Sequence, residues 1–166
     1  MTENVIINAA RISKRVALDE ENGKKLLAEY GIAVPKTVVV PDANSSAAVV
    51  SDLSFPLVVK VVSPDILHKS DAGGVAVGLS DADAVTAAIS EMAEKPIIKS
   101  ANVEGYLIEE MVPAGQELVI GGVRDPQFGP LIMVGLGGIF VEVLADVAFR
   151  VCPINRADAI QMLDEL

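Results

Sequence analysis

The sequence predicts an α/β (α+β) protein with two lobes, on three observations. Hydrophobic residues make up 51% of the 166 but aromatic residues only 4%, which is typical of a core built from aliphatic side chains. Short β-rich runs alternate with helical patterns up to about residue 100, and strand-like runs dominate beyond it. Glycine and proline punctuate these runs. We therefore expect lobes over 33–100 and 101–166, and a helical segment over 1–32 that packs on the second lobe.

The elements of the first lobe follow from local signals. Asp19 and Asp81 are capping residues placed directly before helical patterns, and Gly31 ends the first of these. An Ala-rich stretch between them has helical composition. The predicted helices are 19–30, 43–52 and 81–94. The predicted strands are 36–40, 56–63 and 74–79.

The second lobe is predicted to consist mainly of hairpins. Its predicted strands are 106–112, 117–124, 130–136 and 146–152. Turn signals at 113–115 and 125–129 separate the first three strands as hairpin turns would. Asn155 can cap a last helix that continues to the end of the sequence.

Charge and composition exclude several classes of partner. The chain has 13 Lys and Arg against 23 Asp and Glu, a net charge of −10, which repels nucleic acid at long range. The longest uncharged apolar run, 129–141, is shorter than the roughly 18 residues that span a bilayer. One cysteine, Cys152, forms no internal disulfide, and the N-terminal residues do not have the pattern of a secretory signal. A cytoplasmic protein without nucleic-acid or membrane partners is expected.

An acidic protein that binds an anion must gather a few cations locally, which directs attention to Lys60. Five of the eight residues from 56 to 63 are Leu or Val. A lysine among them either extends from the strand into solvent or faces an anion. Its strand leads directly into the loop that contains the chain's one histidine.

That loop, the His68 loop, has the composition of a phosphate site. His68 stands beside Lys69, with Asp71 close behind and Gly73 and Gly74 at its end. Imidazole can act as a nucleophile toward phosphorus near neutral pH, a lysine can offset the incoming charge, and Asp71 could fix the ring tautomer. The two glycines would allow backbone N–H groups to turn toward a phosphate. A surface histidine in a polar turn is the competing interpretation.

Neither common phosphate fingerprint is present. The stretch GLGGI at 135–139 lacks the third glycine of GxGxxG, and GxxxxGK[ST] does not occur. Glu142 and Asp146, four residues apart, make only a weak candidate metal pair. Phosphate binding would therefore depend on strand lysines and a glycine-containing loop.

Carboxylates at 109, 110 and 117 form a second group of candidates. Glu109 and Glu110 end one predicted strand, and Glu117 begins the next. Carboxylates at such a position can accept hydrogen bonds from an adenine amino group or from ribose hydroxyls. Glutamates on the polar face of a sheet are an equally good interpretation.

Longer stretches carry a resemblance to a known family. They are LLAEYGIAVPKTVVV, FPLVVKVVSPDILHKSDAGGV and VRDPQFGPLIMVGLGGIFVEVLADVAFRVCPI. In this order they resemble the nucleotide-binding ATP-grasp subunit or domain of NDP-forming acyl-CoA synthetases, which are relatives of the succinyl-CoA synthetase β subunit. The resemblance runs from about Leu18 to the end, and it implies a two-lobe ATP-grasp fold without its C-terminal segment.

The resemblance implies roles for the candidate residues. Lys60 corresponds to the strand lysine that contacts ATP phosphates, and His68 to a histidine that this family phosphorylates as a second relay station. Lys69, Gly73 and Gly74 fall in the mobile phosphate loop. The hinge that holds adenine corresponds to Glu109, Glu110, Met111 and Val112, and the acid near the ribose to Glu117. The pattern GGxxxE, with Gly137, Gly138 and Glu142, implies structural or phosphate-loop support.

The implied reaction interconverts acyl-CoA, ADP and phosphate with carboxylic acid, CoA and ATP through a phosphohistidine relay. It requires Mg²⁺, whose family ligands would lie beyond Leu166, and a CoA-binding α subunit or domain as partner. We therefore expect a ligase subunit, of the ADP-forming acetyl-CoA type, with little activity alone. A remnant that binds nucleotide or a partner without turnover is the alternative, and assembly with further copies stays open. A carboxylate–amine ligase would need an amine site that the sequence does not indicate.

Overall fold

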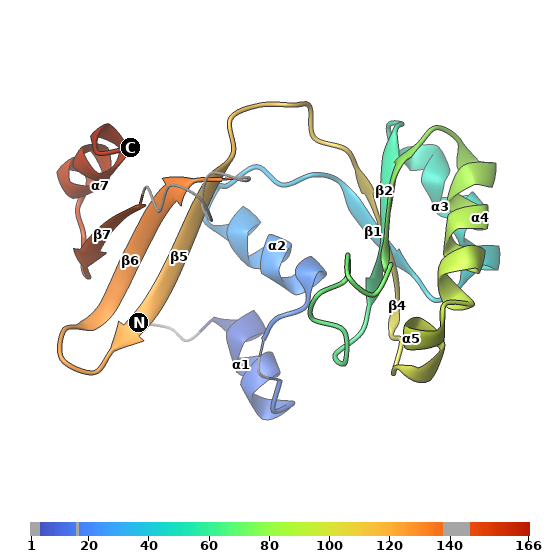
Figure 1. Cartoon of the computed structure of the whole chain (residues 1–166), viewed down its shortest axis with the longest axis horizontal. Helices are drawn as coiled ribbons and strands as arrows, with labels where there is room; N and C mark the ends of the chain where they lie inside the picture. Colours follow the sequence, from blue (N-terminus) through green and yellow to red (C-terminus); the bar gives the residue numbers. More distant parts are fainter. Residues whose placement is uncertain (1–3, 16, 138–146) are drawn as a thin grey trace. The chain divides into compact units, whose positions relative to one another are not determined.

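The computed structural model describes residues 4–15, 17–137 and 147–166, and the chain divides into two units, Met1–Val112 and Pro113–Leu166 (Figure 1). The first unit contains α1 (Val5–Ile12), α2 (Glu20–Glu29), β1 (Thr37–Val40), η1 (Ala43–Ser45), α3 (Ser46–Val49), η2 (Val50–Asp52), β2 (Leu57–Val62), β3 (Val75–Leu79), α4 (Ala82–Ala93), α5 (Pro96–Ser100) and β4 (Gly105–Glu110). The second contains β5 (Leu118–Asp125), β6 (Gly129–Leu136), β7 (Val147–Val151) and α7 (Arg156–Asp164). Among the described residues, no helix is long and apolar enough to span a membrane.

The first unit is built on an antiparallel sheet with the strand order β1-β4-β2-β3. Of its central strands, β2 is aliphatic apart from Lys60, and β4 is buried from Gly105 to Glu109, so both faces of these strands are covered to different degrees. Because side chains alternate along a strand, the register Val59↔Ile108 and Val61↔Tyr106 places these four residues on one face. Val58, Lys60, Leu107 and Glu109 consequently share the opposite face.

Helices α3, α4 and α5 cover the first of these faces (Figure 1). Helix α4 begins at its cap Asp81, whose side chain accepts a hydrogen bond from the Ala84 amide at 2.8 Å. Val85, Ile89 and Met92 then fall on one side of the helix and are at most 1% exposed. Each such aliphatic side chain contributes about 1.5–3 kcal/mol on burial. This layer fixes the sheet, and therefore the direction in which Lys60 points.

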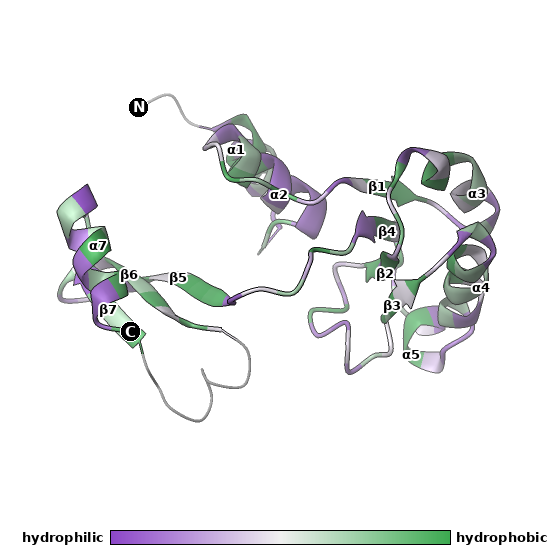
Figure 2. Cartoon of the chain, turned by 90° about the horizontal axis from the view of Figure 1, so that it is seen from above, coloured by the Kyte–Doolittle hydropathy of each residue, from purple (hydrophilic) through white to green (hydrophobic). Residues whose placement is uncertain are grey.

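Helix α2 lies near the opposite face, and it is polar where the strands are apolar. Figure 2 shows much of α2 in purple and β2 largely in green. Asp19 caps α2 as predicted, because its side chain accepts a hydrogen bond from the Asn22 amide. Helix α1 lies within the helical segment predicted over 1–32, although its own bounds were not predicted, and its cap is Asn4, whose side chain accepts from the Ile6 amide at 2.9 Å.

The second unit is an antiparallel sheet, β5-β6-β7, with α7 against one face. Val134, Ala148 and Met162 form its small core. The predicted cap of α7 is confirmed, since Asn155 and Asp158 form a reciprocal capping box. The predicted turn at 125–129 is also confirmed, and Gly129, with φ +78°, supplies the left-handed residue that the turn requires.

One of the predicted connections is wrong. The turn at 113–115 does not join a hairpin, because β4 pairs with β1 and β2 and belongs to the first sheet. The division of the chain after Val112 therefore differs from the lobe boundary predicted at residue 101. The predicted helix at 43–52 is confirmed over the same residues, as the consecutive helical segments η1, α3 and η2, and the Ser46 hydroxyl donates to the Ala43 carbonyl at 2.7 Å.

Candidate functional site

Lys60 lies on β2 and faces the side of the sheet opposite to the helical layer. Its neighbour across the strand pair is Glu109 on β4, displaced by two residues along the register. Lys60 Nζ donates to Glu109 Oε1 at 3.1 Å, and the Glu109 residue is only 6% exposed. The sequence left open whether Lys60 extends into solvent, and the structure gives it carboxylate partners.

Helix α2 adds two more charged side chains at the same point. Glu20 Oε1 accepts from Lys60 Nζ at 2.5 Å and from Lys24 Nζ at 2.9 Å, and Lys24 also pairs with Glu109. Glu20 and Lys24 are four residues apart, so they lie on one side of the helix. Lys69, from the His68 loop, reaches the other Glu20 oxygen at 3.3 Å. We call these five residues the lysine–glutamate cluster: Glu20, Lys24, Lys60, Lys69 and Glu109.

The cluster holds three ammonium groups against two carboxylates, in a partly buried place. Burial alone raises the pKa of the Glu20 carboxyl, but hydrogen bonds from Lys60 and Lys24, and their charges, outweigh burial and lower this pKa to about 2. Burial lowers the pKa of Lys24, and the hydrogen bond and charge of Glu20 offset part of that change. The excess of positive charge is the property that an anion site needs.

The low pKa of Glu20 predicts acid sensitivity. Its folded-state pKa of about 2 lies below the ordinary value of 4.5, so the stabilisation is complete above about pH 4.5 and is lost as the pH falls toward 2. We expect the free energy of unfolding of the wild type to fall more steeply over this range than that of Glu20→Gln. Urea titrations at a series of pH values measure this free energy for both proteins. Equal slopes for the two proteins would show that Glu20 titrates normally.

The His68 loop is anchored at its base and exposed at its tip. Ile66 is 6% exposed and packs into the main core, whereas the His68 side chain is exposed. Asp65 accepts from the Asn102 amide at 2.7 Å. His68 lines an open hollow of about 400 Å³ with Asp65, Ile66, Leu67, Asp71, Ala72 and Ile97. An accessible imidazole beside a lysine of the cluster is the arrangement that a phosphoryl carrier requires.

Asp71 does not orient the imidazole in the structure. In the described ranges, no hydrogen bond or ion pair joins the His68 ring to Asp71. The loop instead closes on itself through its backbone, since the Ala72 amide donates to the His68 carbonyl at 3.3 Å. The proposed control of the ring tautomer by Asp71 thus has no support from this geometry.

The structure explains why glycine stands at both positions at the end of the loop. Gly73 has φ +66°, and its carbonyl accepts from Lys95 Nζ at 2.7 Å. The amides of Gly73 and Gly74 donate to the carbonyls of Ser70 and Lys69, at 3.0 and 2.7 Å. Both amides predicted to turn toward a phosphate are therefore already paired within the loop, and their contact with phosphate stays a prediction.

Gly74→Ala is expected to destabilise the first unit. An added Cβ would lie 2.4 Å from Val61 Cγ1 and 3.1 Å from the Lys69 carbonyl oxygen, and Val61 is fully buried in the core. We expect the free energy of unfolding in urea to fall by about 1–3 kcal/mol. Gly23→Ala is the control, because it is helical with open space around it and should gain about 0.5–1 kcal/mol. A neutral Gly74→Ala would contradict this packing.

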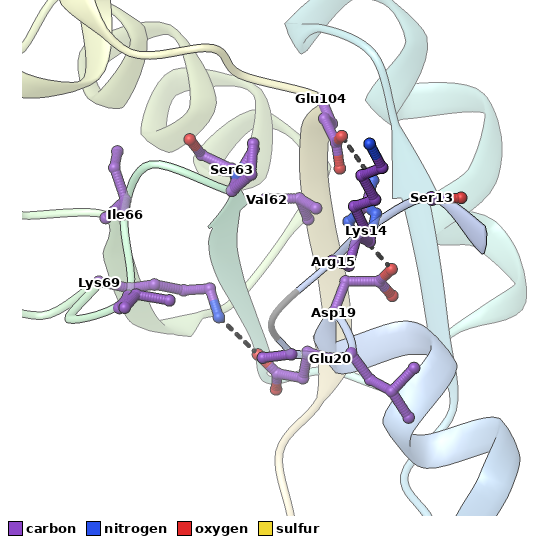
Figure 3. A pocket seen from close by; sticks show the side chains of 14 residues that line it. Ser13, Lys14, Arg15, Asp19, Glu20, Val62, Ser63, Ile66, Lys69 and Glu104 are labelled. Carbon is purple, nitrogen blue, oxygen red and sulfur yellow. Dashed lines mark hydrogen bonds and ion pairs between the residues drawn. The ribbon is translucent and has the colours of Figure 1, made fainter. Parts of the chain in front are cut away.

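A cavity of about 610 Å³ adjoins the cluster (Figure 3). It lies between the connection from α1 to α2, the end of β2 and the start of the His68 loop, and Glu20 and Lys69 stand at its wall. Arg15 crosses it to Glu104 at 2.6 Å and to Asp19 at 3.5 Å. These ion pairs tie the connection between the helices to the start of β4.

The predicted adenine hinge lies at the other end of β4. Glu110 Oε1 accepts from the Ser54 amide at 2.8 Å, and the Met111 amide donates to the Pro56 carbonyl at 3.2 Å. Met111 and Val112 have exposed side chains. Glu109 points into the cluster rather than toward the hinge segment. Contacts of these four residues with a base therefore remain predictions.

Glu117 belongs to the second unit. Its side chain is exposed, and its carbonyl accepts from the Gly137 amide at 2.7 Å. An added Cβ at Gly137 would lie 2.7 Å from Glu117 Cβ, so this glycine permits close approach of two chain segments. Gly138, Glu142 and Asp146 lie outside the described residues.

No group of three or more His, Cys, Asp or Glu residues suited to a metal ion occurs within 4–15, 17–137 and 147–166. The two carboxylates of the cluster are paired with lysines. The described residues therefore do not by themselves fit a Mg²⁺ site.

Sequence reasoning missed Glu20 and Lys24. Their spacing of four residues just after the cap Asp19 is a local signal, but it equally indicates an ordinary helical ion pair. Only the packing of α2 near the sheet brings them to Lys60.

The sequence matches the family described as the ATP-grasp domain over residues 9–166. It is 40% identical to the β subunit of acetate–CoA ligase [ADP-forming] I from Pyrococcus furiosus, an alignment that covers 97% of this chain and 70% of that subunit. It is also 40% identical to 4-hydroxybutyrate–CoA ligase [ADP-forming] from Nitrosopumilus maritimus, covering 95% of this chain and 23% of that protein.

A solved structure agrees with these relatives. The dinucleotide forming acetyl-coenzyme A synthetase 1 of Ca. Korarchaeum cryptofilum, in complex with coenzyme A, Ca-AMPCP and HgCl⁺, superposes with a TM-score of 0.89 at 40% identity. The match covers 96% of this chain and 71% of that one. That protein was captured with a nucleotide analogue and a divalent cation.

Proposed function

Starting from a chain that belongs to the ATP-grasp family, among the β subunits and domains of ADP-forming acyl-CoA synthetases, we propose that it binds ATP or ADP and passes a phosphoryl group between His68 and the nucleotide. The observation that carries this proposal is the convergence of Lys24, Lys60 and Lys69 on one carboxylate. In an acidic protein, three ammonium groups held together at one point favour a phosphate.

The sheet register supports a nucleotide lying along β4. Lys60 stands opposite Leu107, and Met111 follows four residues further along the same strand direction. At about 3.3 Å per residue this separates the phosphate lysine from the predicted hinge by about 13 Å. An extended nucleoside diphosphate spans such a distance. We propose that Glu110, Met111 and Val112 border the base, that the Glu109 side chain stays with Lys60 and Lys24 at the phosphate end, and that Glu117 accepts from the ribose hydroxyls.

Each step of the proposed reaction forms one bond and breaks another. A phosphate oxygen attacks the thioester carbonyl of an acyl-CoA, the C–S bond breaks, and CoA leaves as the thiolate. The acyl phosphate loses its phosphoryl group to a first histidine on the CoA-binding partner, which releases the carboxylate, and the P–N bond to that histidine then breaks as His68 attacks phosphorus. On His68, the P–N bond then breaks as an oxygen of the ADP β-phosphate attacks, and ATP forms. Lys60 and Lys69 offset the charge of the phosphates during this transfer.

Two components would come from outside the described residues. The thioester chemistry belongs to a CoA-binding subunit or domain, in keeping with the coenzyme A held by the related synthetase. Mg²⁺ would shield the phosphates when bound, although the described residues do not supply its ligands. Assembly with a CoA-binding partner in the cytoplasm is part of the proposal.

Phosphoryl transfer to this chain is the direct test. The chain is incubated with ATP and Mg²⁺, or with acetyl-CoA, phosphate and the CoA-binding partner of a relative, and intact mass is recorded. We expect a phosphorylated species that is stable to base and labile to acid, as a phosphohistidine is. ADP added afterwards should remove it and yield ATP. Nucleotide binding without any phosphorylated species in either reaction would favour the alternative, a binding module without turnover.

A further inference from the structure

One carboxylate occupies the position between the three lysines of the cluster. Glu20 Oε1 accepts from Lys60 at 2.5 Å and from Lys24 at 2.9 Å, while Oε2 accepts from Lys69 at 3.3 Å. The carboxylate thus bridges a strand, a helix and the His68 loop through its two oxygens. A phosphate group bound by the same lysines would make the same set of contacts.

Glu20 and Glu109 differ in how firmly they are held. Glu109 lies within β4 at 6% exposure and keeps contacts with Lys60 and Lys24. Glu20 lies in the first turn of α2, its side chain is 24% exposed, and it forms part of the wall of the cavity in Figure 3. Its side chain can therefore rotate toward the cavity while the helix stays in place, whereas Glu109 cannot leave the sheet.

We propose that Glu20 is an exchangeable internal counter-ion, which holds Lys24, Lys60 and Lys69 together in the empty site and yields its place to the nucleotide phosphates. The inference rests on the proposed function, since it takes the phosphate site to be at Lys60. It adds a residue that determines how tightly anions bind, and it links phosphate arrival to release of the His68 loop at Lys69. Glu109 stays behind as the fixed partner of Lys60 and Lys24.

The charge of Glu20 makes exchange necessary. Hydrogen bonds from its lysines hold the Glu20 pKa at about 2 against the opposing effect of burial, so the carboxylate stays ionised at neutral pH. A phosphate that took over its lysines would leave this carboxylate uncompensated, a few ångströms from the charge of the phosphate. Displacement toward solvent removes this repulsion.

The test measures stabilisation of the full chain by inorganic pyrophosphate without divalent metal, against sodium chloride at equal ionic strength. A ligand that binds the folded state stabilises it in proportion to the logarithm of its concentration over Kd, so thermal unfolding up to about 50 mM ligand yields even a millimolar Kd. We expect Glu20→Gln to unfold at a lower temperature without ligand, yet to bind pyrophosphate about three- to tenfold more tightly than wild type. Glu21→Gln is the matched control, because Glu21 pairs with Lys25 and not with the cluster.

The outcomes separate this inference from the proposed function. Lys60→Met, titrated in parallel, should lose the pyrophosphate effect. If it does, but Glu20→Gln binds no more tightly than wild type, Glu20 only positions the lysines and the inference fails alone. If Lys60→Met keeps the effect, or the wild type shows none, the phosphate site itself is misplaced and both fail. Should Glu20→Gln not fold, Glu20→Asp serves instead, with an expected gain smaller than threefold because the shortened carboxylate still competes.

Discussion

His68→Ala is expected to abolish ATP formation from acyl-CoA, ADP and phosphate when the chain works with a CoA-binding partner. The imidazole nitrogen is the proposed carrier of the phosphoryl group, and alanine offers no nucleophile in its place. We expect a loss of at least about 10³-fold in kcat. Because the His68 side chain is exposed and makes no contribution to the core, stability and ADP affinity should stay near wild type. Coupled assay of ATP release, calorimetric ADP titration and thermal unfolding measure the three quantities.

Asp71→Asn is the matched control for this variant. It changes a charge in the same exposed loop, two residues beyond Lys69, without removing a nucleophile. Since no hydrogen bond or ion pair joins Asp71 to the imidazole in the part of the chain that the structure describes, its effect on kcat should be small, within about threefold. Full activity in His68→Ala would exclude His68 from the relay, even if nucleotide binding at Lys60 were intact.

Lys60→Met is expected to weaken ADP binding by about 10- to 100-fold, since a charged hydrogen bond to phosphate is worth about 1.5–3 kcal/mol. Methionine keeps the aliphatic stem on this face of the sheet but removes the ammonium group. The same change takes a partner from Glu109, which is buried, so the free energy of unfolding should also fall. Calorimetry with ADP and urea unfolding measure the two effects.

Lys99→Met is the control for the loss of a positive charge. Lys99 is exposed on α5 and pairs with Glu94 at 2.6 Å, away from the cluster. It should leave ADP affinity within about twofold of wild type, because exposed pairs contribute little. If Lys60→Met binds ADP as tightly as Lys99→Met does, then the nucleotide phosphates lie elsewhere.

Elements with strong local signals were predicted well. Asp19, Asp81 and Asn155 each precede a helical pattern, and each caps a helix in the structure. The strand through Lys60 was predicted from its aliphatic run and is β2. Capping and periodicity depend on residues a few positions apart, so the sequence states them directly.

Predictions that depend on distant partners were less successful. The turn at 113–115 has the composition of a hairpin turn, but β4 finds its partners in β1 and β2, about 50 to 70 residues earlier in the chain. Strand pairing is decided by which edges a fold leaves available, and the turn sequence does not contain that information. By contrast, the helix predicted at 43–52 from local composition is present over the same residues, as η1, α3 and η2.

The candidate site shows the same division. Lys60, His68 and Lys69 were found from sequence because an isolated lysine in an apolar strand and a lone histidine beside a cation are unusual. Glu20 and Lys24 were not, because a glutamate and a lysine four residues apart occur on many exposed helices. The resemblance to acyl-CoA synthetases, stated from the sequence, is confirmed by the family match and by the relatives.

By itself the sequence determined the family and the aliphatic strand through Lys60, and it supplied the candidates for phosphate chemistry, because these depend on composition and on short-range order. The tertiary structure alone decided that α2 brings Glu20 between three lysines, and that the amides of Gly73 and Gly74 bond within their own loop. The physical reason is that charge interactions depend on distance and burial. Both are set by how separate elements pack, which no single segment encodes.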